Sequence, residues 1–207
     1  MTGSMNKIEN YLDELFPNPR CELNYTKDYE LLLATMLSAQ TTDKRVNEVT
    51  AILFKKYPTL KDLSKADIKD VMTIIKPIGT FRKKSYNLIE IAKRLLEDYK
   101  GKMPNDRDYL ETLPGVGRKT TNVVLSNIFN VPCIAVDTHV SRVSKRLKLA
   151  RKNDDPLKIE IKISKKFKKE DLCKRNHQLV LFGRYYCTAR NPKCETCKLK
   201  EICGYKK

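Results

Sequence analysis

The stretch that decides the fold of this chain is LPGVGRKT, residues 113–120. It reads as the end of one helix, a tight glycine turn and the start of a second helix near Arg118. Gly115 and Gly117 carry no side chain, so the backbone amides of the turn can approach a phosphate, and the following helix N-terminus adds partial positive charge. A glycine pair alone occurs in many helix–helix turns. The whole string, with basic residues behind it, indicates a hairpin that docks a phosphate.

The segments on either side of this hairpin follow a helical pattern. Apolar residues recur at three- and four-residue spacing, whereas the 7 glycines and 9 prolines lie mostly between the periodic segments. A length of 207 residues with 41% hydrophobic residues suits one large domain or two small ones. We therefore predict an all-α fold, with helices over residues 7–16, 28–38, 43–56, 67–75, 83–99, 106–112, 119–129, 138–147, 156–167 and 170–185.

The charge balance indicates a polyanionic partner. The chain has 42 Lys and Arg against 25 Asp and Glu, a formal net charge of +17. Such a surplus attracts phosphate backbones in a salt-dependent way, so nucleic acid is the first partner to consider. A lysine-rich surface without a specific partner is the alternative. No apolar run is long enough to span a membrane, and we expect a cytoplasmic protein.

Four of the 7 cysteines gather near the C-terminus with the spacing C-x6-C-x2-C-x5-C; they are Cys187, Cys194, Cys197 and Cys203. This grouping predicts a metal site, because nothing points to the secretion that would favour disulfides. Zinc sites usually combine two short pairs, and only one is present here, so the spacing favours an iron–sulfur cluster and leaves zinc open. Within the loop, Arg190 and Lys193 can present cations to phosphates; the alternative is a metal that merely fastens the C-terminus.

Two residues are candidates for chemistry. Lys119 falls in the first turn of the helix after the hairpin, beside Arg118. The helix dipole and neighbouring cations disfavour its ammonium form, and burial would strengthen this, so Lys119 is a candidate amine nucleophile rather than an ordinary surface lysine. Asp137 follows apolar residues at a helix start, which is typical of an N-cap. The same carboxylate can also stabilise a cation and relay protons beside a nucleophile.

Four motifs in one collinear order carry a resemblance to a known family: LSAQ at 37–40, the hairpin at 113–120, VDTHV at 136–140 and the four cysteines. Together they resemble endonuclease III, the helix-hairpin-helix DNA glycosylase with an associated lyase activity. The resemblance extends over residues 8–205. It implies two helical lobes: a six-helix lobe at 23–132 with the helix-hairpin-helix motif, and a cluster lobe made of 5–22 and 133–207. It also implies that the four cysteines bind a 4Fe-4S cluster.

The resemblance further implies a reaction on double-stranded DNA that carries an oxidised pyrimidine or an abasic site. Lys119 matches the lysine that attacks the sugar, releases the base and leaves a Schiff base, from which β-elimination nicks the strand. Asp137 matches the aspartate that assists this step. Gln40 and Phe81 match the residues that fill the hole left by the extruded nucleotide. The further contacts expected with DNA are Gly115, Gly117, Arg118, His139, Arg142, Arg190 and Lys193.

Two other readings stay open at this stage. A mismatch-specific adenine glycosylase shares the hairpin, the aspartate and the cluster, but it would be expected to have a glutamate in the helix that carries residues 31–38, where this chain has LATM at 33–36, and no lysine at 119. A non-catalytic DNA-binding module would use the hairpin and the metal only for docking, which leaves the pair Lys119 and Asp137 unexplained. We expect the bifunctional enzyme, acting as a monomer.

Overall fold

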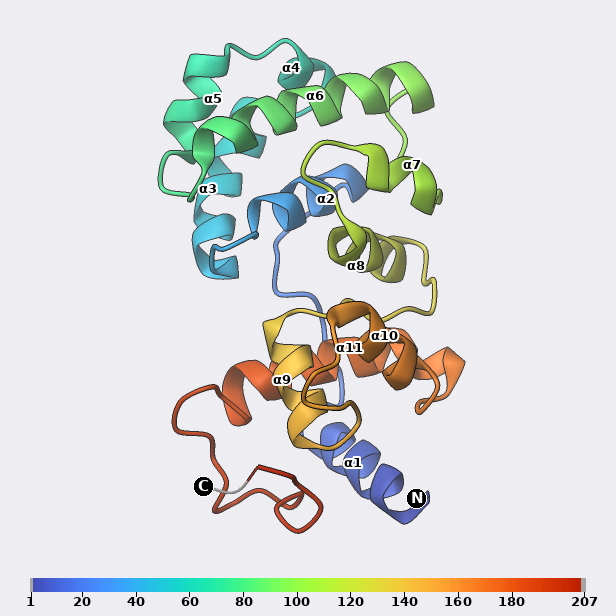
Figure 1. The fold of residues 1–207 in the computed structure, drawn as a ribbon. Coiled ribbons are helices and arrows are strands. Elements are labelled where there is room, and N and C mark those ends of the chain that lie inside the picture. Colours follow the sequence, from blue (N-terminus) through green and yellow to red (C-terminus); the bar gives the residue numbers. More distant parts are fainter. Residues whose placement is uncertain (1, 206–207) are drawn as a thin grey trace. The chain divides into compact units, whose positions relative to one another are not determined.

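The computed structural model describes residues 2–205, which form helices joined by turns and loops (Figure 1). No strand occurs in this part of the chain, so the prediction of an all-α fold is confirmed. The α-helices are α1 (Thr2–Leu15), α2 (Asp28–Leu37), α3 (Asp43–Lys56), α4 (Leu60–Ser64), α5 (Ile68–Ile75), α6 (Phe81–Tyr99), α7 (Arg107–Thr112), α8 (Arg118–Ile128), α9 (Thr138–Arg146), α10 (Pro156–Ser164) and α11 (Leu172–Leu181). Within residues 2–205, no helix has the length and apolar character that a membrane span requires.

The chain divides into two compact units. We call Glu22–Phe129 the central unit, and Met1–Cys21 together with Asn130–Lys207 the terminal unit. The structure describes every residue of the central unit and finds seven helices there, one more than the six expected. The additional helix, α4, has only 5 residues and begins at a capping box between Thr59 and Asp62. Such a short element is too brief to show a helical period in the sequence.

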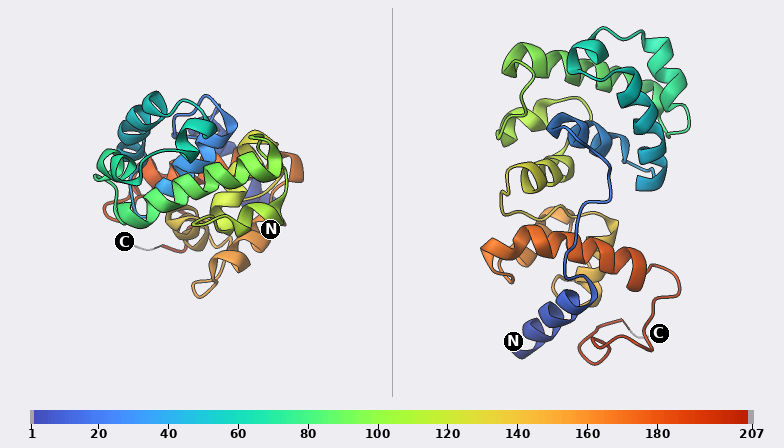
Figure 2. Two further views of the ribbon diagram at one scale, coloured as in Figure 1. Left: turned by 90° about the horizontal axis from the view of Figure 1, so that it is seen from above. Right: turned by 180° about the vertical axis from the view of Figure 1, so that it is seen from behind.

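The central unit is built around α2, with α3, α6 and α8 packed against it (Figures 1 and 2). Every residue from Glu30 to Leu37 is buried. The Glu30 carboxylate accepts hydrogen bonds from the backbone amides of Thr26 at 2.7 Å and Lys27 at 3.1 Å, which satisfies donors at the start of the helix. Packing on all sides and a capped N-terminus fix α2, and with it the turn that follows Leu37.

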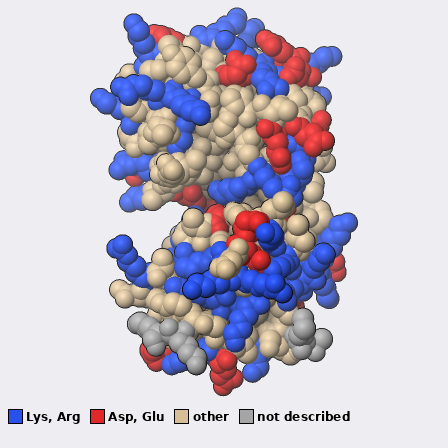
Figure 3. Space-filling view, in the orientation of Figure 1, with Lys and Arg blue, Asp and Glu red and all other residues tan. Residues whose placement is uncertain are grey.

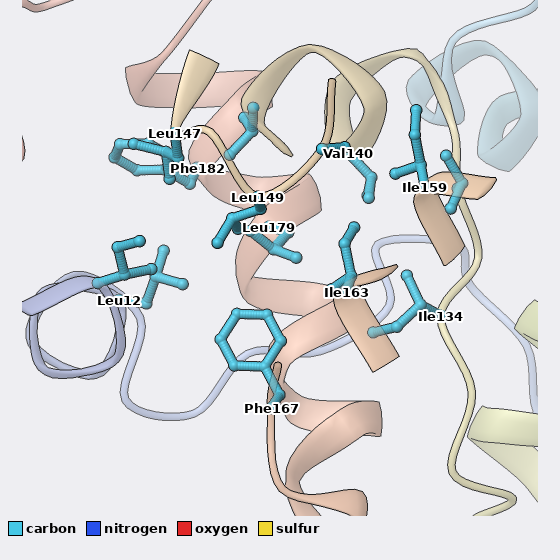
Figure 4. Close-up of a cluster of buried hydrophobic side chains, with 14 of the residues drawn as sticks. Leu12, Ile134, Val140, Leu147, Leu149, Ile159, Ile163, Phe167, Leu179 and Phe182 are labelled. Atoms are coloured by element: carbon cyan, nitrogen blue, oxygen red, sulfur yellow. The ribbon is translucent and has the colours of Figure 1, made fainter. Parts of the chain in front are cut away.

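The terminal unit has its own hydrophobic core, formed by side chains from α1, α9, α10 and α11 (Figure 4). Leu12, Val140, Ile159 and Phe182 all contribute to it. A buried polar group also joins α1 to α11: Arg175, which is only 5% exposed, donates from Nη1 to Asp13 Oδ1 at 2.8 Å. The N-terminal helix is therefore part of this core although more than 100 residues separate it from the rest.

The single C-terminal helix expected over 170–185 is divided into three segments. A 3-10 turn (Lys169–Asp171) precedes α11, and a π-helical turn, η2 (Phe182–Tyr186), follows it. The amide of Cys187 donates to the carbonyl of Phe182 at 2.6 Å, the five-residue spacing of a π turn. A Cβ atom on Gly183 would lie 2.8 Å from Cβ of His139, so this glycine lets η2 pack closely on α9. The π turn ends at the first cysteine of the loop.

Candidate functional site

The hairpin predicted from the sequence is present between α7 and α8. Leu113 and Val116 are buried, and the Val116 amide donates to the Leu113 carbonyl at 3.1 Å, which closes the turn. Gly115 has φ +78°, in the left-handed region that favours glycine. Gly117 is the N-cap of α8. Two apolar anchors thus hold a turn whose glycines are both exposed.

The N-terminus of α8 begins directly at the exposed Gly117. Gly117 supplies no side-chain cap, and the hydrogen bond from Thr121 N to Gly117 O, at 3.0 Å, is the first bond of the helix. The amides between these two residues precede the intrahelical ladder, and they lie at the positive end of the helix dipole. Arg118 and Lys119 are both exposed in this first turn. Lys119 is therefore accessible to a substrate, and the burial considered for it from the sequence is absent.

Asp137 is the N-cap of α9, as its position in the sequence predicted. Its Oδ1 accepts from the amide of Val140 at 2.7 Å. Within residues 2–205, no hydrogen bond to its second carboxylate oxygen is found. One oxygen therefore fixes the side chain at the helix start, while the other remains available to a ligand.

Arg142 and Arg146 lie one turn apart on α9 and fasten the start of the cysteine loop. Arg142 donates from Nε to the Cys187 carbonyl at 3.1 Å and from Nη2 to the Gly183 carbonyl at 2.6 Å; Nη2 also lies 3.2 Å from His139 Nδ1. Its guanidinium thus bridges α9 and the start of the cysteine loop within the terminal unit. His139 thereby belongs to the same hydrogen-bonded group as Arg142.

Arg146 was not singled out from the sequence, although its four-residue spacing from Arg142 was a signal that both face the same way. It donates from Nη1 to the Thr188 carbonyl at 2.7 Å and contacts Cys187 Sγ at 3.3 Å. Its guanidinium also lies 3.9 Å from the ring centroid of Tyr205, near the other end of the loop. One arginine therefore holds both ends of the cysteine loop.

The four cysteines Cys187, Cys194, Cys197 and Cys203 line a single cavity of about 410 Å³. Burial raises the pKa of the Cys197 thiol, and the other three cysteines raise it further, so each of the three lies within electrostatic reach of Cys197. In the described part of the chain, no three metal-binding side chains converge on a single-ion site. Four sulfur donors spread around one cavity are the donor set that an iron–sulfur cluster uses.

The two cations predicted within this loop are both exposed. Lys193 lies with Nζ 5.6 Å from the ring centroid of Tyr186, and its amide donates to the Tyr186 carbonyl at 3.1 Å. The carbonyl of Arg190 accepts from the Thr188 hydroxyl at 2.6 Å. Short-range hydrogen bonds therefore hold the backbone of the loop, while both cationic residues remain exposed.

Gln40 lies in the turn between α2 and α3, as predicted, with φ 58°. Phe81 does not lie in a loop: it is the first residue of α6, partly exposed, with the Arg82 guanidinium 4.9 Å from its ring centroid. The loop residue before it is Thr80, which also takes a left-handed conformation, with φ 57°. Left-handed backbone at residues with side chains is uncommon and gathers at functional sites.

Comparisons with known proteins place this geometry in a family. A model of the HhH-GPD superfamily of base excision DNA repair proteins matches residues 33–169. The chain is 46% identical to endonuclease III of Bacillus subtilis over 203 residues, which are 97% of this chain and 93% of that protein. The chain belongs to the endonuclease III family. It is 44% identical to endonuclease III of Escherichia coli K12 over 196 residues, 94% of this chain and 92% of that one.

Structural similarity leads to the same family. The solved structure of a trapped endonuclease III–DNA covalent intermediate in an estranged-adenine complex matches with a TM-score of 0.92 at 43% identity, covering 97% of this chain and 95% of that one. A thermostable thymine-DNA glycosylase matches with a TM-score of 0.83 at 24% identity, covering 99% and 97%, which shows a shared fold. As a member of the endonuclease III family, the protein is a DNA glycosylase and AP lyase of base excision repair.

The family match also identifies the metal centre. The iron–sulfur binding domain of endonuclease III matches residues 187–203, so the match begins and ends at cysteines of the loop. This member of the endonuclease III family carries a 4Fe-4S cluster, and the zinc alternative is excluded. On the face drawn in Figure 3, Lys and Arg side chains gather over the terminal unit, as an enzyme that binds a phosphate backbone requires.

Proposed function

We propose that this protein removes oxidised pyrimidines from double-stranded DNA and nicks the strand at the resulting abasic site, using Lys119 as nucleophile. The observation that carries the proposal is the place of Lys119, exposed in the first turn of α8 directly after a helix N-terminus without a side-chain cap. That N-terminus can bind a phosphate of the substrate strand, so the lysine stands beside the bound backbone. A relative at 43% identity has been trapped as a covalent intermediate with DNA, which supports a covalent route.

The proposed reaction first releases the base, then cleaves the strand, and ends with hydrolysis of the Schiff base. The Lys119 amine attacks C1′ of the extruded nucleotide; the new N–C1′ bond replaces the N-glycosidic bond, and the base leaves with its electron pair and takes up a proton. The sugar opens to a Schiff base, which acidifies the C2′ proton. Loss of that proton breaks the C3′–O bond and releases the 3′ phosphate. Hydrolysis of the Schiff base then frees the lysine.

Asp137 is proposed to assist this chemistry through its second carboxylate oxygen. The cap bond to Val140 holds the side chain, so the remaining oxygen is presented in a fixed direction. A carboxylate in that position stabilises positive charge that develops on the sugar and relays protons to and from the leaving base. Both tasks need its negative charge, whereas the cap does not.

The remaining proposed contacts serve binding. Gly115, Gly117 and Arg118 would hold a phosphate at the hairpin, and Gln40 and Phe81 would fill the space left by the extruded nucleotide. Arg190 and Lys193 are exposed cations that would meet the backbone elsewhere. We propose that the enzyme works as a monomer in the cytoplasm, with the nucleoid if the cell is prokaryotic.

The thiolates of Cys187, Cys194, Cys197 and Cys203 are proposed to hold the 4Fe-4S cluster. When bound, the cluster supplies a rigid cross-link for a loop that has few apolar side chains of its own, rather than redox chemistry on the substrate. Arg142 and Arg146 position the first cysteine from α9. The loop that carries Arg190 and Lys193 would thereby be ordered before DNA binds, which lowers the entropic cost of the contact.

The decisive experiment uses wild type, Lys119→Gln and the matched control Lys93→Gln, which removes an exposed lysine from α6. Each is incubated with duplexes that carry one thymine glycol or one A·G mismatch, with borohydride present. We expect a covalent adduct on thymine glycol for wild type and the control, and none for Lys119→Gln, with DNA affinity within a few-fold. Adenine release from the mismatch without an adduct, or nicking by Lys119→Gln at the wild-type rate, would overturn the proposal.

A further inference from the structure

Lys84 is a buried cation on α6 that the proposed chemistry does not use. The residue is only 5% exposed, although lysine is almost never fully buried unless it is paired. Its Nζ donates to the carbonyl oxygen of Leu37 at 2.9 Å and to that of Ala39 at 2.7 Å. Burial lowers the pKa of this ammonium, so the two carbonyls must offset the cost of keeping a charge inside the unit.

These two carbonyls belong to the end of α2 and the turn after it. The last carbonyls of a helix have no partner within the helix, and a cation from a neighbouring helix can satisfy them. The turn is closed by a hydrogen bond from Thr41 N to Ser38 O at 3.0 Å. Gln40 lies within this turn, between Ser38 and Thr41, and has a left-handed backbone conformation. The Lys84 ammonium therefore holds the backbone directly before a strained residue that is proposed to enter DNA.

The same lysine is also bonded to the second segment proposed to enter DNA. Its amide donates to the carbonyl of Thr80 at 3.1 Å, the first hydrogen bond of α6. Thr80 is itself left-handed, and Phe81 follows it. The backbone of Lys84 thus belongs to the start of α6, while its side chain binds the Gln40 turn. One residue joins two strained segments that are about 40 positions apart in the sequence.

We propose that Lys84 is a positioning residue that holds the Gln40 turn at a fixed distance and orientation from the Thr80–Phe81 segment. The inference rests on the proposed function, in which Gln40 and Phe81 fill the space left by the extruded nucleotide. Extrusion of the nucleotide costs free energy, because the base is unstacked. Side chains that fill the vacated space offset more of this cost when they are already in place than when they must first be ordered. Lys84 acts on base removal through the turn, without touching DNA.

The test compares Lys84→Met with Lys83→Met, a matched control because Lys83 is the exposed neighbour on the same helix. Single-turnover base removal is measured on a thymine glycol duplex, and strand cleavage on a duplex with a preformed abasic site. We expect base removal by Lys84→Met to fall about tenfold and cleavage at the abasic site to change by less than about threefold, because that site has no base to extrude. The control should match wild type on both.

Gln40→Ala and the double variant with Lys84→Met separate this inference from the proposed function. If Lys84 acts through the turn, the double variant is no slower than Gln40→Ala alone. An unchanged rate for Gln40→Ala would overturn the role proposed for Gln40. If Gln40→Ala removes the base slowly but Lys84→Met does so at the wild-type rate, only the role of Lys84 is overturned. The same holds if Lys84→Met loses equal activity on the thymine glycol duplex and on the abasic duplex.

Lys84→Arg is a second test variant, which is used if Lys84→Met does not fold. It keeps a cation beside the two carbonyls but displaces the turn, so slower base removal with retained abasic cleavage is expected. Wild-type rates on both duplexes would overturn the inference.

Discussion

A Cβ atom built on Gly115 would lie only 2.5 Å from Nδ2 of Asn87, a buried side chain on α6. The same atom would lie 3.3 Å from Met36 on α2, and the backbone at Gly115 has φ +78°. Gly115→Ala is therefore expected to destabilise the protein by about 1–3 kcal/mol, through a left-handed alanine and an overpacked contact. The free energy of unfolding from urea titrations measures this.

Gly117→Ala is the matched comparison, because no atom lies within 4 Å of a Cβ built there and the backbone φ of −117° suits any residue. We expect unchanged stability but weaker DNA binding, since a methyl group would stand where a phosphate approaches the amides of α8. Fluorescence anisotropy with an abasic-analogue duplex gives the affinity. Full affinity in Gly117→Ala would show that the hairpin does not meet phosphate at this residue.

The hairpin could be predicted from the sequence because its determinants are local. Two glycines, two apolar anchors and the basic residues behind them lie within eight consecutive positions, and the structure places Leu113 and Val116 in the core as such a pattern requires. The N-cap at Asp137 is equally local, because the capping oxygen and the amide it binds are three residues apart. The contact of Gly115 with Asn87 is different, because it depends on how α6 packs.

Asp137→Asn should separate the two roles of this side chain. Asparagine caps a helix about as well as aspartate, so the bond to the Val140 amide and the stability of α9 are expected to remain. Loss of the negative charge is expected to slow base removal by about 100-fold, while DNA binding changes little. Single-turnover kinetics and thermal unfolding of the same preparation give both quantities.

Asp137→Ala supplies the control, since it removes the cap together with the charge. It should lose about 1 kcal/mol of stability as well as activity. If Asp137→Asn removed the base at the wild-type rate, Asp137 would act only as the N-cap of α9.

The features that the sequence did not reveal depend on contacts between distant residues. Nothing around Lys84 marks it as buried, because its partners Leu37 and Ala39 lie more than 40 positions away. The sequence likewise gives no sign that Arg142 bonds to the backbone at the start of the cysteine loop. Its partners at Gly183 and Cys187 become visible only when the π turn brings them against α9.

Arg146→Met is expected to make the cluster less durable. The guanidinium donates to Thr188 O at 2.7 Å and contacts Cys187 Sγ at 3.3 Å, so its loss frees the first cysteine of the loop. We expect the visible absorbance of the cluster to decay about tenfold faster in air, with activity falling in parallel. Lys145→Met, one position earlier on α9, is the control. Equal rates of decay in the two variants would mean that Arg146 does not stabilise the cluster.

Asp13 should make stability depend on pH. Burial raises the pKa of its carboxyl, but hydrogen bonds from Lys174, Gln178 and Arg175 outweigh burial and hold the pKa well below its ordinary value of 3.8. A carboxylate favoured by the folded state contributes stability that is complete above that ordinary value and is lost as pH falls toward the folded pKa. Asp13→Asn also leaves the buried guanidinium of Arg175 without its charged partner.

Asp13→Asn is therefore expected to lower the free energy of unfolding at pH 7 by about 1–2 kcal/mol, a figure kept small because the Asp13 side chain is 37% exposed and partly screened by water. The difference from wild type should shrink below about pH 4, where the carboxylate begins to take up its proton in the unfolded chain. Urea titrations at a series of pH values test this, with Glu90→Gln, an exposed charge on α6, as control. A difference that stays constant with pH would mean that Asp13 stabilises α1 through hydrogen bonds that asparagine cannot make rather than through its charge.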